Sequence, residues 1–232
     1  MIRVIDIETT GLDQDKDAIV EIATITLTAD GGYSDPWEVI VDPGVAIPPR
    51  ASAVHHITDA DVRGAPKLAD VMANLKSDVW IAHNAKFERS FLERHGLKGE
   101  WICTMKCALR QWGNSDSWPG ASNQELRYWL GLIDPLGVKR AEINPHRALS
   151  DCLVTGAIFH HLSRDVRFSD MKAWSSEPAV YPVLTFGKHR GMRLSEAPAD
   201  YLDWLATGRH EMDEDWRHTA RTEIDRRRME VT

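Results

Sequence analysis

Acidic and histidine side chains recur at the ends of expected structural elements in separate parts of the sequence. Asp6 and Glu8 lie at the end of an expected strand, and Glu88 follows an expected strand-to-helix junction. His146 and Asp151 lie at the start of a long expected helix. Converging carboxylates can hold two divalent cations about 3.5–4 Å apart, which stabilise the attacking and leaving oxygens of an in-line displacement. Because a nearby histidine can take a proton from water, the pattern predicts metal-assisted hydrolysis.

Each of these residues also has an ordinary structural explanation. An isolated Asp-x-Glu pair on a strand is usually a solvated face, and Asp151 alone is favoured by the helix dipole. His146 alone suits a capping or surface position. The acids of segment 5–8 alternate with isoleucines, however, which draws them toward the sheet interior, where unpaired carboxylates are costly. Metal binding removes this cost, so the residues taken together favour a metal site.

Hydrophobic periodicity predicts the elements that must bring these side chains together. Residues 2–8 mix β-branched and charged side chains and stop at a Thr-Thr-Gly turn, which is typical of a strand. Strands followed by helices predict an α/β domain whose mixed sheet carries an antiparallel hairpin. The other expected elements are a β-hairpin from 19–29 and 37–41, a helix over 66–76, a strand over 79–82, and helices from 83 to Gly96, over 103–112, over 122–130 and over 147–162.

Composition and charge exclude several classes of protein. The chain has 232 residues, and 28 Lys and Arg against 35 Asp and Glu give a net charge of −7. This argues against binding nucleic acid by bulk electrostatics, but not against a nuclease whose acids hold metal. No run approaches the roughly 18 apolar residues of a membrane span, and the start of the chain is not typical of a signal peptide. We therefore expect a cytoplasmic protein without a membrane partner. Three cysteines suit neither a disulfide framework nor a zinc site.

A second, smaller unit is expected near the C-terminus. The periodicity lapses over 166–182, which predicts a linker between a first domain over 1–165 and an α+β domain over 183–232. That domain contains the turn Phe186-Gly187-Lys188-His189-Arg190-Gly191. Glycines allow close backbone approach and the two cations are donors, so this segment either grips phosphate or is a tight turn in a small folding unit.

Aromatic and basic residues elsewhere leave two readings open. Trp112 or Trp118, in an expected loop, either stacks on an unpaired base or packs the loop against the core. The three consecutive arginines 226–228 are best explained as a solvated helix face.

Three ordered segments resemble the motifs of a known enzyme family. Asp6-Ile7-Glu8-Thr9-Thr10-Gly11, the segment from His83 to Leu92, and His146-Arg147-Ala148-Leu149-Ser150-Asp151 resemble the motifs of the DEDDh superfamily, the ribonuclease-H-like 3′→5′ exonucleases. Val54-His55-His56-Ile57-Thr58 is similar to a further element of that family, and the match covers residues 1–165. Segments 99–106 and 185–191 resemble its exonuclease X branch. The resemblance implies a ribonuclease-H-like mixed sheet flanked by helices.

The resemblance also implies roles for individual residues. It makes Asp6, Glu8 and Asp151 the ligands of the tighter of two Mg²⁺ ions, with Mn²⁺ as a substitute, and Asp6 bridges to the second ion, which Glu88 also binds. His146 is implied as the general base, and the implied substrate is a single-stranded or frayed DNA 3′ end. The residues implied to contact or order this substrate are Thr9, Thr10, Gly11, His55, Ile57 and Asn84.

One position departs from the family pattern. The second motif normally has Phe-Asp, whereas this chain has Phe87-Glu88, so a carboxylate of the second metal lies one methylene further from the backbone. Placement within about 0.5 Å matters for catalytic groups. Two alternatives therefore stay open beside a DNA exonuclease: an RNA exonuclease of the same fold, and a catalytically weak module that binds nucleic-acid ends.

Overall fold

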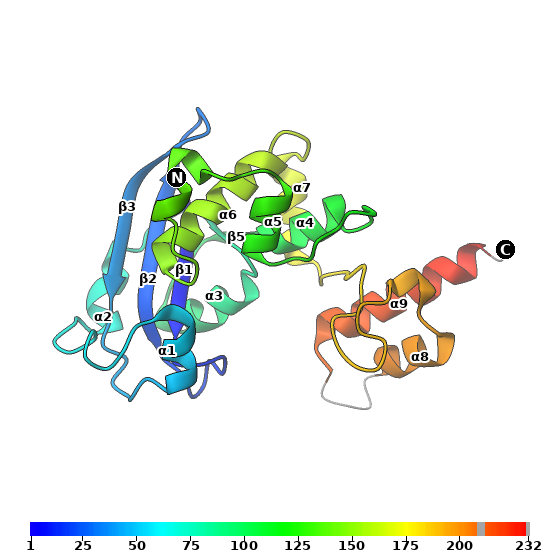
Figure 1. Cartoon of the computed structure of the whole chain (residues 1–232), viewed down its shortest axis with the longest axis horizontal. Helices are drawn as coiled ribbons and strands as arrows, with labels where there is room; N and C mark the ends of the chain where they lie inside the picture. The colour runs from blue at the N-terminus through cyan, green and yellow to red at the C-terminus, as the bar shows by residue number, and fades with distance from the viewer. Residues whose placement is uncertain (208–211, 231–232) are drawn as a thin grey trace.

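The computed structural model describes residues 1–207 and 212–230 (Figure 1). Its strands are β1 (Ile2–Thr9), β2 (Ile19–Leu27), β3 (Tyr33–Ile40), β4 (Val79–Ala82) and β5 (Glu100–Cys103). Its α-helices are α1 (Pro49–His55), α2 (Leu68–Val71), α3 (Lys86–Leu92), α4 (Thr104–Trp112), α5 (Asn123–Trp129), α6 (Ala148–Leu162), α7 (Phe168–Ser176), α8 (Ala199–Thr207) and α9 (Glu214–Glu230).

The strands form one mixed sheet in the order β3-β2-β1-β4-β5. β1 pairs antiparallel with β2, and β2 pairs antiparallel with β3, so the first three strands form a meander. β4 and β5 extend the sheet in parallel with β1. The predicted hairpin and mixed α/β sheet are confirmed.

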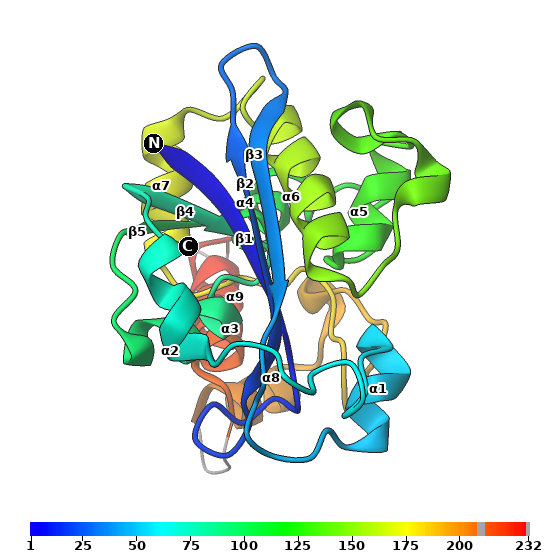
Figure 2. The same cartoon turned by 90° about the vertical axis from the view of Figure 1, so that its left-hand side faces the viewer.

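Helices cover both faces of this sheet (Figure 2). Alternation along β1 divides its side chains: Val4 packs into the cluster that includes α6, whereas Ile5 and Ile7 pack into the cluster that includes α3. The even-numbered residues of β1 therefore face α6. This places Asp6 and Glu8 on the same face as the helix that begins at Ala148.

Helix α6 is buried over most of its circumference. Its apolar residues pack on β1 and β2, and α4 and α5 pack beside it. A helix that is apolar all round belongs in a core, which fixes its first turn relative to β1. The N-terminal turn of α6 contains Asp151, so core packing holds that carboxylate near the end of the strand.

The structure contains three elements that the periodicity does not predict. α1 lies between the expected hairpin and the helix expected over 66–76, and it starts with Pro49 in its first turn, where the missing N–H costs nothing. β5 is only four residues long, and α7 lies inside the expected linker 166–182. The helix expected over 66–76 is limited to α2 and a 3₁₀ turn over Met72–Asn74.

The segment 166–182, expected to be a linker, contains a packed helix in its first part. α7 packs against β5 and α4, and its Met171 is buried in the main core. Its inward-facing residues Met171 and Ser175 are one helical turn apart, and most of its other positions are partly or fully exposed. Two inward positions are too few to produce a clear hydrophobic period.

Residues 183–207 and 212–230 form what we call the C-terminal unit, which has a core of its own. Leu184, Tyr201, Leu202 and Trp216 belong to this cluster, and α8 and α9 pack against each other. Figure 1 shows the unit beside the sheet-containing part of the chain. No helix in the described residues is long and apolar enough to cross a membrane.

Candidate active site

Three carboxylates meet where the end of β1 faces the start of α6. Asp6 and Glu8 project from β1 on the α6 side, and Asp151 lies in the first turn of that helix. One ligand oxygen from each of the three lies within 4.8 Å of the others. The predicted convergence of Asp151 with two acids more than 140 residues before it in the sequence is present in the structure.

The Asp151 carboxylate is held in place through both of its oxygens. The backbone N–H of His146 donates to Oδ2 at 2.8 Å, and the side-chain amide of Gln124 donates to Oδ1 at 3.3 Å. His146 has a left-handed backbone, with φ of 62°, which turns the chain into α6. Asp151 is thus oriented by groups from two elements before any ligand is present.

Burial and mutual repulsion raise the pKa values of the acids in this cluster. Burial, followed by the charges of Asp151 and Glu88, raises the pKa of Asp6 well above its ordinary value. Burial, Asp151 and Glu21 raise the pKa of Glu8 to about 9. Carboxylates crowded in this way favour protonation unless a cation compensates them.

The donor set suits a hard divalent cation. All three side chains offer oxygen ligands, which Mg²⁺, Mn²⁺ and Ca²⁺ prefer, and no thiol or imidazole joins them in the cluster. A bound cation also neutralises the repulsion that raises the two pKa values. The residues present therefore fit a divalent metal centre.

Glu88 lies in the same region but not in the three-acid cluster. It is only 3% exposed, and its Oε2 has no hydrogen-bond partner in the described part of the chain. Burial raises the pKa of Glu88 to about 8, and its charge contributes to the pKa shift of Asp6. A buried carboxylate oxygen without a partner is costly, so Glu88 is available to a cation that the three-acid cluster holds.

His146 is exposed beside the cluster. Its backbone contact with Asp151 keeps the residue at the entrance to α6, and its imidazole lies close enough to influence the charge on Asp151. An exposed imidazole next to a metal centre can reach a water molecule there. The structure thus brings His146 to the carboxylates, as predicted.

A buried ion pair supports the start of α6, and the sequence analysis missed it. Glu21 on β2 is fully buried and accepts two hydrogen bonds from Nε of Arg147, at 3.0 and 3.1 Å. Its Oε2 also accepts the backbone N–H of Ala148 at 2.9 Å. Glu21 lies opposite Glu8 in the β1–β2 register, so Arg147 compensates a like-charge pair. The available signal was a lone acid inside the apolar run 19–23.

Replacing Glu21 with glutamine is expected to destabilise the protein by about 2 kcal/mol, because hydrogen bonds to a charged group are lost while Arg147 can still turn to water. Urea denaturation in EDTA measures the change. Glu142→Gln, on an exposed 3₁₀ turn, is the control and should lie within about 0.5 kcal/mol of the parent. Equal midpoints for the two variants would show that the pair does not stabilise the fold.

A pocket of about 510 Å³ opens next to Glu8. Its walls come from the turn after β1, from α1 and from α3. α1 contributes His55, and α3 contributes Phe87. His55 is buried, and its Nδ1 accepts the backbone N–H of Ile57 at 3.0 Å. The residues that line the pocket include Glu8, Thr9, Thr10, Gly11, Leu12, Arg50, Val54, His55 and Phe87.

The turn after β1 has a built conformation. Thr9 donates its hydroxyl to the carbonyl of Gly11 at 2.5 Å, and Thr10 donates to the Asp17 carboxylate at 3.1 Å. A Cβ on Gly11 would lie 2.4 Å from that same carboxylate, so a larger residue there would displace the Asp17 side chain from the turn. The predicted Thr9-Thr10-Gly11 element therefore forms one wall of the pocket.

Two predicted substrate residues do not line this pocket. Ile57 is buried in a small cluster with Val20 and Ile47, so it supports α1 from beneath. Asn84 is exposed with φ of 66°, and its carbonyl accepts the N–H of Phe87 at 2.8 Å. It shapes the turn into α3, which agrees with an ordering role in the second motif. Conversely, Phe87 and Gln124 had no role predicted from the sequence. Phe87 lies inside the second motif, whereas nothing local in the sequence marks Gln124.

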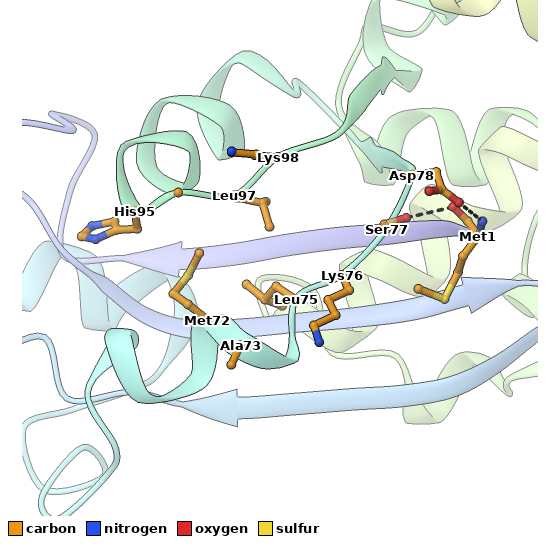
Figure 3. A pocket seen from close by; sticks show the side chains of 11 residues that line it. Met1, Met72, Ala73, Leu75, Lys76, Ser77, Asp78, His95, Leu97 and Lys98 are labelled. Carbon is orange, nitrogen blue, oxygen red and sulfur yellow. Dashed lines mark hydrogen bonds and ion pairs between the residues drawn. The ribbon is translucent and has the colours of Figure 1, made fainter.

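Another pocket, of about 570 Å³, lies at the opposite end of the sheet (Figure 3). It is lined by Met1, at the start of β1, and by residues of segments 72–78 and 95–98. Its one acid, Asp78, forms an ion pair with the N-terminal ammonium group. Because no carboxylate cluster lies there, this pocket is not a candidate metal centre.

Metal removal is expected to make stability strongly dependent on pH. The folded-state pKa values of Glu8 and Glu88, about 9 and about 8, exceed the ordinary value of 4.5. The folded protein then binds more protons than the unfolded chain, so stability falls as pH rises from about 5 to 9. In EDTA, Tm should decrease from about pH 6 to about pH 8.5, and added Mg²⁺ should raise Tm more at the higher pH. A Tm in EDTA that rises over this interval would contradict the assignment.

Comparison with known proteins agrees with this geometry. The exonuclease family model matches residues 4–159. Exodeoxyribonuclease 10 of Escherichia coli (strain K12) is 34% identical over 237 aligned residues, which cover 95% of this chain and 97% of that protein. A solved structure of exonuclease X in complex with 5′ overhanging duplex DNA, also 34% identical, superimposes with a TM-score of 0.63 over 76% of this chain and all of that chain.

A more distant structure shares the fold alone. E. coli exonuclease I in complex with a dA16 oligonucleotide is 16% identical, with a TM-score of 0.55 over 75% of this chain and 42% of that chain. The predicted resemblance to ribonuclease-H-like exonucleases is confirmed. From the family match, the extent of the identity and the arrangement of the sheet, we conclude that the chain belongs to the exonuclease family.

Proposed function

We propose that this protein is a metal-dependent 3′→5′ exodeoxyribonuclease that releases mononucleotides from single-stranded or frayed DNA ends. The observation that carries the proposal is the group of Asp6, Glu8 and Asp151 beside a pocket of nucleotide size. A relative 34% identical over almost the whole chain is an exodeoxyribonuclease, and exonuclease X has been solved with duplex DNA. These names support DNA as the substrate class.

The side chains divide the work of phosphodiester hydrolysis. Divalent cations, for which we propose two Mg²⁺ ions with Mn²⁺ as a substitute, supply Lewis-acid stabilisation of the charge that develops on the phosphate oxygens. Asp6, Glu8 and Asp151 would hold the cations at the end of β1, with Glu88 as a further ligand. His146 accepts the proton of the attacking water.

The adjoining pocket positions the terminal nucleotide. Thr9, Thr10 and Gly11 form one wall, in the turn that the two threonine hydroxyls stabilise, and Phe87 lies at the other. An aromatic face and a polar turn on opposite sides suit a base and a sugar. Because Glu8 belongs both to this pocket and to the acidic cluster, a nucleotide seated here would place its phosphate next to the carboxylates.

A time course with 5′-labelled single-stranded DNA and the matching RNA tests the proposal. Each polymer is incubated with Mg²⁺, Mn²⁺ or EDTA, beside an Asp6→Ala variant. We expect a ladder of 3′-shortened DNA products that requires both the metal and Asp6. A ladder on RNA alone would identify an exoribonuclease, and binding to ends without any ladder would identify an end-binding module.

Shortening Glu88 to aspartate should raise the half-saturating Mg²⁺ concentration by about tenfold. The neighbouring Phe91 and Leu92 are buried in the core, so α3 cannot shift to carry a shorter side chain toward the cluster. A metal titration of the initial rate measures this, with Glu93→Asp at the exposed end of α3 as the control. If rate and metal dependence both equal those of the parent, the extra methylene of Glu88 has no role.

We also propose a division into a catalytic domain and the C-terminal unit, with the boundary after α7 rather than at residue 165. The packing of α7 on β5 and the separate core of the C-terminal unit support this division. A cytoplasmic location stays a prediction. Its support is that Cys103, Cys107 and Cys152 are free and buried, which suits a reducing compartment.

A further inference from the structure

The turn 186–191 in the C-terminal unit has no part in the site described above, yet it is a constructed feature. The backbone N–H of Gly191 donates to the carbonyl of Leu184 at 2.7 Å, and the backbone N–H of Leu184 donates to the carbonyl of Met192 at 2.9 Å. An isolated antiparallel bridge between Val183 and Arg193 closes its base. The loop that presents Lys188 and Arg190 is therefore pinned at both ends.

Tyr201 supports this turn from below. Its ring is 4.6 Å from the ring of His189 in an edge contact, and Nζ of Lys188 lies 5.6 Å from the Tyr201 ring centroid. Gly187 has φ of 70°, and a Cβ on it would lie 2.5 Å from the Tyr201 hydroxyl. Any side chain at this position would therefore displace the turn from its support.

The cations of the turn are available to a ligand. Lys188 and Arg190 are both exposed, and neither forms an ion pair with a carboxylate in residues 1–207 and 212–230. Tyr201, which is only 6% exposed, has a buried hydroxyl without a hydrogen-bond partner in the described residues, and the same is true of Nε2 of His189. Exposed cations without a carboxylate partner, next to buried polar atoms without hydrogen bonds, are unusual in a turn that serves only to connect two elements.

A pocket of about 310 Å³ separates this turn from the catalytic domain. Arg190 and Gly191 line one side, and Trp118, Gly120 and Glu125 line the other. The Glu125 carboxylate accepts hydrogen bonds from the backbone and hydroxyl of Ser122 at 3.1 and 2.7 Å, which hold it against the start of α5. Aromatic and basic groups on opposite walls suit a nucleic-acid strand.

This pocket lies close to the catalytic carboxylates through α5. Gln124, which precedes the pocket residue Glu125, donates to Asp151. Polar contacts hold the C-terminal unit against the catalytic domain, among them an ion pair of Lys86 on α3 with Asp213 at 2.7 Å and a hydrogen bond from Arg193 to the carbonyl of Ser115 at 3.1 Å. The turn is thus held at a fixed place beside the segment that borders the metal centre.

We propose that the turn 186–191 is a second phosphate-binding site, which holds the DNA strand on the 5′ side of the nucleotide being removed. Lys188 and Arg190 donate to backbone phosphates, and the glycines allow the strand to approach closely. This inference rests on the proposed exonuclease function. It implies that the C-terminal unit contributes to binding long substrates and not to the hydrolytic step.

Substrate length separates this site from the catalytic centre. The double variant Lys188→Ala/Arg190→Ala is compared with the parent on single-stranded DNA of roughly 20 nucleotides and on the p-nitrophenyl ester of thymidine 5′-monophosphate. We expect KM for the long DNA to rise about tenfold, with kcat and hydrolysis of the ester unchanged. The salt dependence of binding, as log K against log salt, should lose about 0.7 per phosphate contact removed.

A matched control and a second variant keep the test decisive. Lys76→Ala/Lys98→Ala removes the same charge at the pocket of Figure 3, at the far end of the sheet, and should leave KM unchanged. Gly187→Ala retains both cations but disturbs the turn, and should reproduce the loss on long DNA alone. Equal KM values for the turn variants and the parent, or an equal loss in the control, would overturn the proposal. Failure of the parent to cleave either substrate would instead refute the exonuclease function.

Discussion

Replacing Asp6 with asparagine is expected to lower the rate of phosphodiester hydrolysis by at least about 10³-fold, because charge stabilisation by bound cations contributes several kcal/mol to the barrier. Asp6 lies on the α6 face of β1, within 4.8 Å of both Glu8 and Asp151 through their ligand oxygens. Asparagine keeps the size and one oxygen but not the charge. Initial rates on labelled single-stranded DNA across a Mg²⁺ titration measure the loss.

Stability provides the control for the Asp6 variant. Burial and the charges of four neighbouring carboxylates raise the pKa of Asp6, so its charge opposes folding when no metal is present. Asp6→Asn should therefore leave Tm in EDTA unchanged or higher, while it abolishes the increase in Tm that Mg²⁺ produces in the parent. A lower Tm together with normal Mg²⁺ stabilisation would show that Asp6 supports the fold rather than the metal.

Replacing His146 with asparagine is expected to lower kcat by about 10² to 10⁴-fold and to leave KM for DNA nearly unchanged, since a general base acts in the transition state. Asparagine is chosen because it tolerates the left-handed backbone of residue 146, where φ is 62°. The backbone N–H that orients Asp151 is then retained. Single-turnover rates with saturating enzyme measure the chemical step.

The matched control is His95→Ala, which removes an exposed histidine at the pocket of Figure 3. It should keep the kcat of the parent. The half-saturating Mg²⁺ concentration should also be the same for His146→Asn and the parent, because His146 is not a ligand in this proposal. A kcat within a few-fold of the parent for His146→Asn would assign proton transfer to another group.

The sheet and its main helix were predictable because their residues repeat a strong local pattern. Val79–Ala82 is a short apolar run and was assigned correctly, as was the long helix α6. β5 offers only four residues, and α7 presents just Met171 and Ser175 as buried side chains. Elements of this kind exist because neighbouring elements cover them, so their stability comes from tertiary contacts that local periodicity does not record.

The candidate site was predictable to the extent that its residues belong to recognisable motifs. Strand alternation predicts that Asp6 and Glu8 share a face, and the place of Asp151 at the start of an expected helix favours its convergence with them. The resemblance was needed to assign the separate roles of these acids. Gln124 could not be predicted, because its contact with Asp151 depends on how α5 packs beside α6. The pairing of Glu21 with Arg147 links residues 126 positions apart and likewise needs the folded chain.

Both edges of the sheet are blocked against pairing with another chain. β3, at one edge, carries Pro36 and a left-handed Asp35, with φ of 49°, which interrupt a regular ladder. At the other edge, α7 lies along β5, and the N–H of Cys103 donates to Oγ of Ser175 at 2.8 Å. A fragment ending at residue 165 would lack α7 and leave the outer edge of β5 open to strand addition, so it should self-associate. A fragment that retains α7 should stay monomeric.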